Sequence, residues 1–182
     1  MKHVIIVRYA EIFLKGKNRG YFERVFVMNM EKALRGIRHE IRRASGRYLV
    51  EGFDEEQTEE VVSRLCKVFG THSLSVAYVV PSEREEIVAA AKLVCRPQGT
   101  FKVETHRADK TYPMNSMEFS AWLGGELLEA YPHLRVDVHA PQFTVYADIR
   151  ENGVTMLFSE FLPGAGGMPA GSAGKGVLLL SG

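Results

Sequence analysis

The sequence is poor in cysteine and contains no long apolar run. Its two cysteines, Cys66 and Cys95, form no Cys-x-x-Cys pair and fall among apolar residues of predicted helices. We therefore expect two buried, reduced thiols and no zinc site built on paired thiols. No apolar run approaches the roughly 20 residues that span a bilayer, and the run at residues 4–7 is too short for a secretory signal. A cytoplasmic protein is expected.

Signatures of an active site are also missing. The histidines show no metal-ligand pairing at helical spacing, and neither a nucleophile elbow nor a pair of carboxylates stands out. The glycine-rich stretch before Gly174 is not a Walker loop, because Pro169 stands where its first glycine is needed and Gly176 where it needs Ser or Thr. We therefore expect neither a metal site nor catalytic residues in this chain.

The net charge of +1 hides an uneven distribution. Residues 1–50 hold 12 Lys and Arg but only 4 Asp and Glu, whereas residues 51–182 hold 11 and 18. A basic N-terminal third suits a phosphate backbone. A solvated basic surface without a partner is the alternative.

The first 80 residues alternate strand and helix patterns. Residues 4–8 predict a buried strand, and a helix capped by Asn18 carries apolar residues at helical spacing as far as Arg35. Asp54 and Gln57 are placed as a capping box for a second helix, whose apolar face includes Phe69. The other strands are expected at residues 37–44, 47–51 and 73–80. The order β-α-β-β-α-β is that of a ferredoxin-like domain over residues 1–80.

A second, α/β domain is expected over residues 81–162, which makes the fold class α+β. Its helices follow capping boxes at Ser82 with Glu85 and at Asn115 with Glu118. Its strands are expected at residues 100–106, 134–138, 143–149 and 154–158, with a hairpin at Asn152-Gly153. Residues 163–176, rich in Gly and Pro, predict a linker. Residues 177–182, which begin with an apolar run of four residues, predict the first strand of a further domain that is missing.

Two polar loops carry the candidate binding residues. Lys15, Lys17, Asn18 and Arg19 lie at a helix start, where unpaired backbone N–H groups and the helix dipole favour an anion such as phosphate. A basic loop without a ligand is the alternative. The second loop joins a strand to a helix and holds Arg107, Lys110, Tyr112 and Ser116. Cations beside an aromatic ring are typical of proteins that bind single-stranded nucleic acid.

Five segments, taken together and in order, resemble the beginning of the tRNA 4-thiouridine synthases. They are YAEIFLKGKNRGYFE (9–23), SGRYLVEG (45–52), FKVETHRADKTYPMNSMEF (101–119), VDVHAP (136–141) and GGMPAGSAGKGVLLLSG (166–182). That family has a ferredoxin-like domain, then a THUMP domain, then a PP-loop ATP pyrophosphatase domain. The resemblance implies that residues 81–162 are an RNA-binding THUMP domain and that residues 177–182 begin a truncated PP-loop domain.

The resemblance implies a reaction for the full-length parent. Such a tRNA sulfurtransferase uses ATP and Mg to adenylate the uridine at tRNA position 8, and persulfide sulfur, usually from a cysteine desulfurase, then gives 4-thiouridine. Some members also supply sulfur for thiamine synthesis, and the family is often dimeric. Its catalytic cysteines lie in the PP-loop portion. The present chain is therefore expected to bind tRNA, to hold no cofactor and to be inactive.

The resemblance also implies roles for individual residues. Both polar loops fall on RNA-binding segments, and the loop at Arg107 is implied to hold the acceptor end of tRNA near its 3′ CCA. Asp109 is expected to organise Arg107 and Lys110 rather than to contact RNA. The start of the ATP site is matched, without being completed, by Leu179, Leu180, Ser181 and Gly182.

Two other functions compete with this one. The first is a free-standing, non-catalytic module that presents tRNA to a partner enzyme. The second is a THUMP-bearing methyltransferase or pseudouridine synthase. It would require a methyl-donor or synthase domain after Gly182, and the PP-loop-like ending argues against it.

Overall fold

The computed structural model describes residues 1–9, 11–44, 46–174 and 176, apart from the side chains of residues 13–15. The chain divides into two compact units. The first unit consists of Ile5–Leu74 with Phe161–Gly182, and the second of Met1–Val4 with Ser75–Glu160. No helix within the described ranges is long and apolar enough to cross a bilayer.

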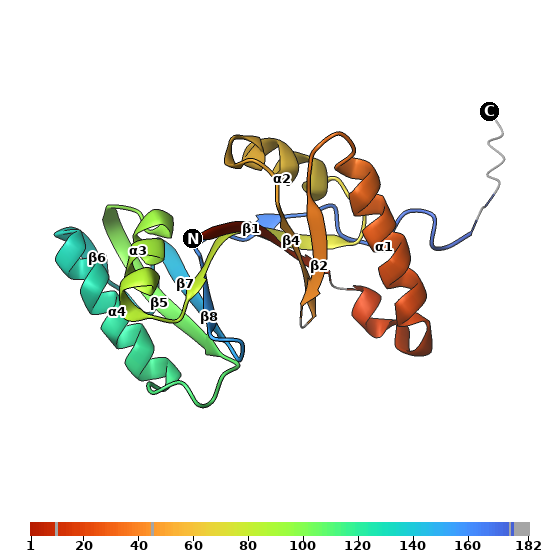
Figure 1. The fold of residues 1–182 in the computed structure, drawn as a ribbon. Helices are drawn as coiled ribbons and strands as arrows, with labels where there is room; N and C mark the ends of the chain where they lie inside the picture. Colours follow the sequence, from red (N-terminus) through yellow and green to blue (C-terminus); the bar gives the residue numbers. More distant parts are fainter. Residues whose placement is uncertain (10, 45, 175, 177–182) are drawn as a thin grey trace. The chain divides into compact units, whose positions relative to one another are not determined.

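The first unit has the predicted β-α-β-β-α-β order (Figure 1). Its helices are α1 (Arg19–Ala33) and α2 (Thr58–Cys66), with the 3-10 helices η1 (Glu11–Asn18) and η2 (Glu55–Gln57). Its strands are β1 (Lys2–Tyr9), β2 (Glu40–Ala44), β3 (Arg47–Glu51) and β4 (Thr71–Pro81), in the order β2-β3-β1-β4. Strand β3 is antiparallel to both β1 and β2. This is the expected ferredoxin-like arrangement.

Aromatic rings attach α1 to the sheet of the first unit. Tyr9 of β1, Phe26 of α1 and Tyr48 of β3 are all buried, with ring centroids between 5.7 and 6.2 Å apart. Burial of a side chain of this size contributes about 1.5–3 kcal/mol. Because successive side chains of a strand point to opposite faces of the sheet, Tyr9 and Tyr48 identify the face of β1 and β3 that α1 covers.

The second unit is a mixed sheet with two helices. Its helices are α3 (Arg84–Val94) and α4 (Ser116–Ala130). Its strands, besides β4, are β5 (Gln98–Arg107), β6 (His133–Val136), β7 (Phe143–Arg150) and β8 (Val154–Phe158). The order is β4-β8-β7-β5-β6; β8 is antiparallel to both neighbours, and β5 is parallel to β6 and β7.

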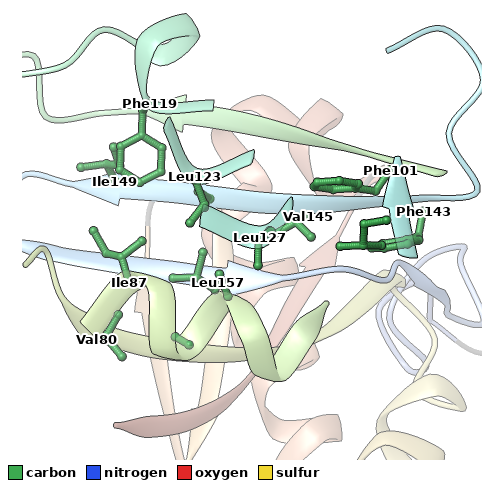
Figure 2. Packing of buried hydrophobic residues seen from close by; sticks show 14 residues of the cluster. Val80, Ile87, Phe101, Phe119, Leu123, Leu127, Phe143, Val145, Ile149 and Leu157 are labelled. Atoms are coloured by element: carbon green, nitrogen blue, oxygen red, sulfur yellow. The ribbon is translucent and has the colours of Figure 1, made fainter. Parts of the chain in front are cut away.

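Helices α3 and α4 pack on one face of this sheet (Figure 2). Alternate residues of β7, from Phe143 to Ile149, are buried against them, as the period of two predicts. They meet Phe119, Leu123 and Leu127, which recur at helical spacing along α4 (Figure 2). Strand β5 lies against α4, and its last residue leads directly into the loop that begins this helix.

The hairpin predicted at Asn152-Gly153 is confirmed, and β2 and β3 also pair across a short turn. Across the β2–β3 turn, Ala44 pairs with Arg47. Between β7 and β8, Gly153 has φ 72° and its N–H donates to Arg150 O at 3.2 Å. Glycine adopts such a positive φ without steric cost, so the Asn-Gly pair closes this hairpin as expected.

Only one predicted helix cap forms through side chains. Asn115 Oδ1 accepts from the N–H groups of Met117 (2.9 Å) and Glu118 (3.0 Å), and Glu118 Oε2 accepts from Asn115 N (2.9 Å). Asn18 stands at the N-cap of α1 as predicted, and Asp54 at that of η2, but neither side chain makes a capping bond. The prediction for Ser82 is wrong, because Glu83 is the N-cap of α3. A 3-10 helix leads into α1 and into α2. The Ser82 hydroxyl instead bonds to Thr155 Oγ1 at 2.9 Å.

Several burial predictions are also corrected. Phe69, expected on a helix face, is 56% exposed, because α2 already ends at Cys66. Cys66 and Cys95 are half-buried rather than buried, and both are free thiols. Burial nevertheless raises the pKa of both thiols, that of Cys95 to about 11, so both are protonated at neutral pH.

The first part of the glycine-rich segment is attached to the first unit. Strand β9 (Leu162–Pro163) pairs with β4, and the N–H groups of Gly164, Ala165 and Gly166 donate to backbone carbonyls of residues 66–72 at 2.8–3.0 Å. A Cβ on Gly164 would lie 2.3 Å from Thr71 O, so only glycine permits this approach. No apolar period predicts such an attachment, because backbone N–H and C=O groups make these bonds.

Candidate nucleic-acid interface

Arg107 holds the loop between β5 and α4 in shape. Its Nη1 donates to the backbone carbonyls of Tyr112 and Met114, both at 3.1 Å. The backbone N–H of Ala108 donates to Ile149 O at 2.9 Å, which ties the start of the loop to β7. A guanidinium that bonds two carbonyls keeps its full charge. Arg107 therefore supplies positive charge and loop structure together.

Asp109 makes a local turn inside the same loop. Its Oδ1 accepts from Thr111 Oγ1 at 2.6 Å and from Thr111 N at 2.8 Å. These bonds, and to a smaller extent the nearby Arg107, lower the pKa of the Asp109 carboxyl. Asp109 thus organises the loop through its hydrogen bonds to Thr111, whereas it was expected to organise Arg107 and Lys110. Lys110 is exposed at the loop surface.

Tyr112 connects the loop to the core of the second unit. Its ring packs edge-on against Phe119, with centroids 5.7 Å apart, and its hydroxyl donates to Ser82 O at 3.4 Å. Burial raises the pKa of this phenol, so it remains a donor at neutral pH. Because the ring is half-buried, a base can contact only its exposed part.

The start of α4 is a weak place for an anion. Asn115 occupies the N–H groups of Met117 and Glu118, and the Glu118 carboxylate lies in the first turn. A capped terminus with an acidic side chain has less attraction for phosphate than an open one. Ser116, the first residue of α4, is half-buried, and it faces a neighbouring groove.

This groove, about 620 Å³ in volume, lies between β5 and α4. Its walls are mainly apolar, with a few hydroxyl groups, and include Val103, Thr105, Ser116, Met117, Ser120 and Leu128. Nothing lies within 4 Å of the position a Cβ would take on Gly125, another lining residue. An apolar slot with hydroxyls at its edge has the chemistry needed for an unstacked base.

The predicted basic loop of the first unit is broken by a glycine. Gly16 (φ 47°, ψ −123°) interrupts η1 just before α1 begins at Arg19. Lys17 and Asn18 are exposed, and the Asn18 side chain makes no capping bond. The side chain of Lys15 lies outside the described residues. The loop therefore presents Lys17 at the approach to the helix.

Arg19 belongs to a hydrogen-bonded cluster that the sequence did not reveal. Its Nε donates to Glu23 Oε1 at 2.8 Å and its Nη2 to the Tyr9 hydroxyl at 2.7 Å. Tyr9 donates to the same Glu23 oxygen at 2.9 Å, and Arg43 Nη2 does so at 3.0 Å. Of these contacts, only the i,i+4 spacing of Arg19 and Glu23 left a pattern in the sequence.

The predicted residues thus fall into two sets. Arg107, Asp109, Lys110, Tyr112 and Ser116 come together in the second unit, whereas Lys17, Asn18 and Arg19 lie in the first. Leu179, Leu180, Ser181 and Gly182 lie outside the described residues. Within the described part of the chain, no three His, Cys, Asp or Glu side chains are grouped so as to hold a metal ion.

Both units match known protein families. Residues 4–75 match the ThiI ferredoxin-like domain and residues 84–158 the THUMP domain. A probable tRNA sulfurtransferase of Natranaerobius thermophilus is 42% identical over 100% of this chain and 46% of its own length. The chain thus spans about half the length of the curated relatives it matches.

Solved structures give the same similarity. A crystal structure of a 4-thiouridine synthetase–RNA complex with bound ATP matches with a TM-score of 0.87 and 34% identity, over 100% of this chain and 47% of that one. A protein from Pyrococcus horikoshii Ot3 matches with a TM-score of 0.78 and 28% identity, over 93% of this chain and 58% of that one.

Proposed function

Because the chain belongs to the ThiI family through its ferredoxin-like and THUMP domains, we propose that it is the tRNA-binding portion of an ATP-dependent tRNA sulfurtransferase that makes 4-thiouridine at position 8 of tRNA. One observation carries this proposal. The whole chain superposes, with a TM-score of 0.87, on about half of a 4-thiouridine synthetase whose crystal structure contains RNA.

The chemistry of the loop after β5 supports this function. Arg107 and Lys110 bring positive charge to a loop of fixed shape, beside a mainly apolar groove of about 620 Å³. Phosphate contacts of this kind give affinity with little sequence readout. Recognition of the acceptor end and its unpaired 3′ CCA needs just this combination, because all tRNAs share that end.

The thiolation chemistry belongs to the parent enzyme in this proposal. The parent uses ATP and Mg to adenylate the uridine, receives persulfide sulfur from a cysteine desulfurase, and in some members also serves thiamine synthesis. Cys66 and Cys95 are poor candidates for sulfur transfer, because the burial that raises the pKa of both thiols keeps them protonated. The present chain should therefore bind tRNA and leave it unmodified.

The test compares two lysines of the second unit. Binding of a fluorescein-labelled tRNA transcript is measured by anisotropy over a series of salt concentrations. Lys110→Ala should weaken binding about threefold and lower the slope of log affinity against log salt by about 0.7–0.9. Lys92→Ala removes the same charge from the exposed surface of α3 and should leave both quantities unchanged. No binding by the unchanged chain at low salt, or equal effects of both variants, would contradict the proposal.

A second experiment tests the reaction. Fusing the chain to the ATP pyrophosphatase domain of a relative should give 4-thiouridine that depends on ATP, on Mg and on a persulfide donor, measured by mass spectrometry of digested tRNA. The unfused chain is the control and should give none. Fusion proteins that bind tRNA but never thiolate it would instead favour a module that presents tRNA to another enzyme.

A further inference from the structure

Two arginines of the first unit share one buried carboxylate. Glu23 is 6% exposed, and its Oε1 accepts from Arg19 Nε at 2.8 Å and from Arg43 Nη2 at 3.0 Å. Because both nitrogens contact the same oxygen, the two guanidinium groups are close neighbours. Like charges this close repel each other unless an anion holds them together.

The charges within this cluster do not balance. Arg19 and Arg43 bring two positive charges, Glu23 brings one negative charge, and Tyr9 is a neutral donor because burial raises the pKa of its phenol. The Tyr9 hydroxyl donates to Glu23 at 2.9 Å and accepts from Arg19 Nη2 at 2.7 Å. These four side chains together therefore carry one more positive than negative charge, which favours the approach of an anion.

The cluster is open on the side of Arg43. The Arg43 side chain is 59% exposed although it is anchored on Glu23, whereas the Glu23 carboxylate is covered. Arg43 lies on β2 and pairs with Tyr48 of β3, whose ring packs on Phe26 of α1. Strand β2 and helix α1 thus both fix the position of the Arg43 guanidinium. Lys17, two residues before Arg19 in the sequence, is also exposed.

We propose that Arg43, paired with Arg19, binds a phosphate of the tRNA backbone, and that Glu23 is the positioning residue for both guanidinium groups. A guanidinium matches phosphate through a planar fork of donors, and one that is already oriented loses less side-chain freedom on binding. The site is a second RNA contact, in the first unit, separate from the loop at Arg107. It rests on the proposed function, since it requires tRNA as the ligand.

Glu23→Gln separates positioning from charge. This change removes a negative charge from a basic surface, so simple electrostatics predicts tighter binding of RNA. If Glu23 positions the two arginines, a neutral amide holds them less firmly, and binding becomes weaker by at least about threefold. The two roles therefore predict opposite signs.

Arg43 is tested by a matched set of substitutions in the full chain. Arg43→Ala should weaken binding of the labelled tRNA about three- to tenfold and lower the salt slope by about 0.9. Arg43→Lys keeps the charge and should restore the slope but only part of the affinity. Arg38→Ala removes an exposed arginine beyond the other end of α1 and should have less than about a twofold effect. The urea midpoint of each variant shows that it remains folded.

The outcomes distinguish this inference from the proposed function. An unchanged salt slope in Arg43→Ala, or tighter binding by folded Glu23→Gln, would overturn the inference while Lys110→Ala still weakens binding. If Glu23→Gln fails to fold, the Arg43 series decides alone. If the unchanged chain does not bind tRNA at low salt, both proposals are wrong. If Arg43→Ala binds tRNA more weakly and with a lower salt slope, while Arg38→Ala has no effect, the phosphate site at Arg43 and Arg19 is supported.

Discussion

Arg107 and Arg19 each lie beside a loop that leads into a helix, and the two are held in different ways. Arg107 bonds to two backbone carbonyls of its own loop, which are neutral. Arg19 bonds to a buried carboxylate and a phenol, which belong to an α-helix and a β-strand. The first arginine bridges two carbonyls of a loop whose other internal bonds join Asp109 to Thr111. The second is itself positioned by rigid elements around it.

Because of this difference, we expect Arg107 to act mainly through the shape of its loop and Arg19 mainly through its charge. Removing Arg107 should disturb every contact that the loop makes, including those of Lys110 and Tyr112. Removing Arg19 should delete one charge and leave β1 and α1 in place. Binding measured at several salt concentrations distinguishes the two cases, because the slope counts the phosphates that are neutralised.

Arg107→Ala should have the largest effect. Two loop carbonyls lose their donor, and a hydrogen bond from a charged group contributes about 1.5–3 kcal/mol. We expect tRNA binding to weaken more than about tenfold. The salt slope should fall by more than about 0.9, which corresponds to the loss of more than one phosphate contact. Anisotropy measures the binding, and urea unfolding followed by the single tryptophan, Trp122 in the same unit, measures the stability.

The control for this variant is Arg107→Lys. A lysine keeps the charge but lacks the planar fork that faces the two carbonyls, so it should restore little of the binding. Full recovery with lysine would mean that Arg107 acts by its charge alone. The contrast with Arg19 would then disappear.

Arg19→Ala should have a smaller and simpler effect. Glu23 keeps its bonds from Tyr9 and Arg43, so the first unit stays folded while one phosphate contact is lost. We expect binding to weaken about three- to tenfold and the salt slope to fall by about 0.9. Arg19→Lys should recover most of the slope. A loss of tRNA affinity as large as that caused by Arg107→Ala would show that Arg19 also supports local structure.

Much of the fold could be predicted from the sequence, because its signals are local. The period of two from Phe143 to Ile149 and the helical spacing of Phe119, Leu123 and Leu127 mark a strand and a helix without knowledge of any distant contact. The glycine-rich segment after Leu162 gave no such signal. Its attachment is made by backbone groups, which every residue carries, so no residue type reveals it.

The candidate site was predicted unevenly for a similar reason. Its residue types and their loops could be named, but not the partners of each side chain. Glu23 is 14 residues from Tyr9 and 20 from Arg43, and only the folded sheet brings them together. Arg107 was expected to face RNA, yet its hydrogen bonds to carbonyls leave no trace in residue identity. The charges were therefore easier to predict than their arrangement.

Asn115→Ala should affect stability more than binding. The variant loses the side-chain acceptor for two N–H groups at the start of α4, and loss of such a cap costs about 1 kcal/mol. Asn115→Asp keeps an acceptor and should restore the stability. Because the loop remains fixed by Arg107, tRNA binding should change by less than about twofold. A larger loss of affinity would indicate that the cap, and not Arg107, determines the loop.

The smallest effect concerns the pH dependence of the loop. The pKa of Asp109 is lowered in the folded chain, chiefly by the bond from the Thr111 hydroxyl. The stabilisation by the ionised carboxylate is therefore present above the ordinary pKa of about 3.9 and is lost as the pH falls through the lower, folded value. The amide NMR signal of Thr111 should stay constant from neutral pH down to about pH 5 and move with a midpoint below 3.9. In Asp109→Asn this titration should vanish. A wild-type midpoint at or above the ordinary value would show that the turn does not favour the ionised side chain, and the loop would then depend on Arg107 alone.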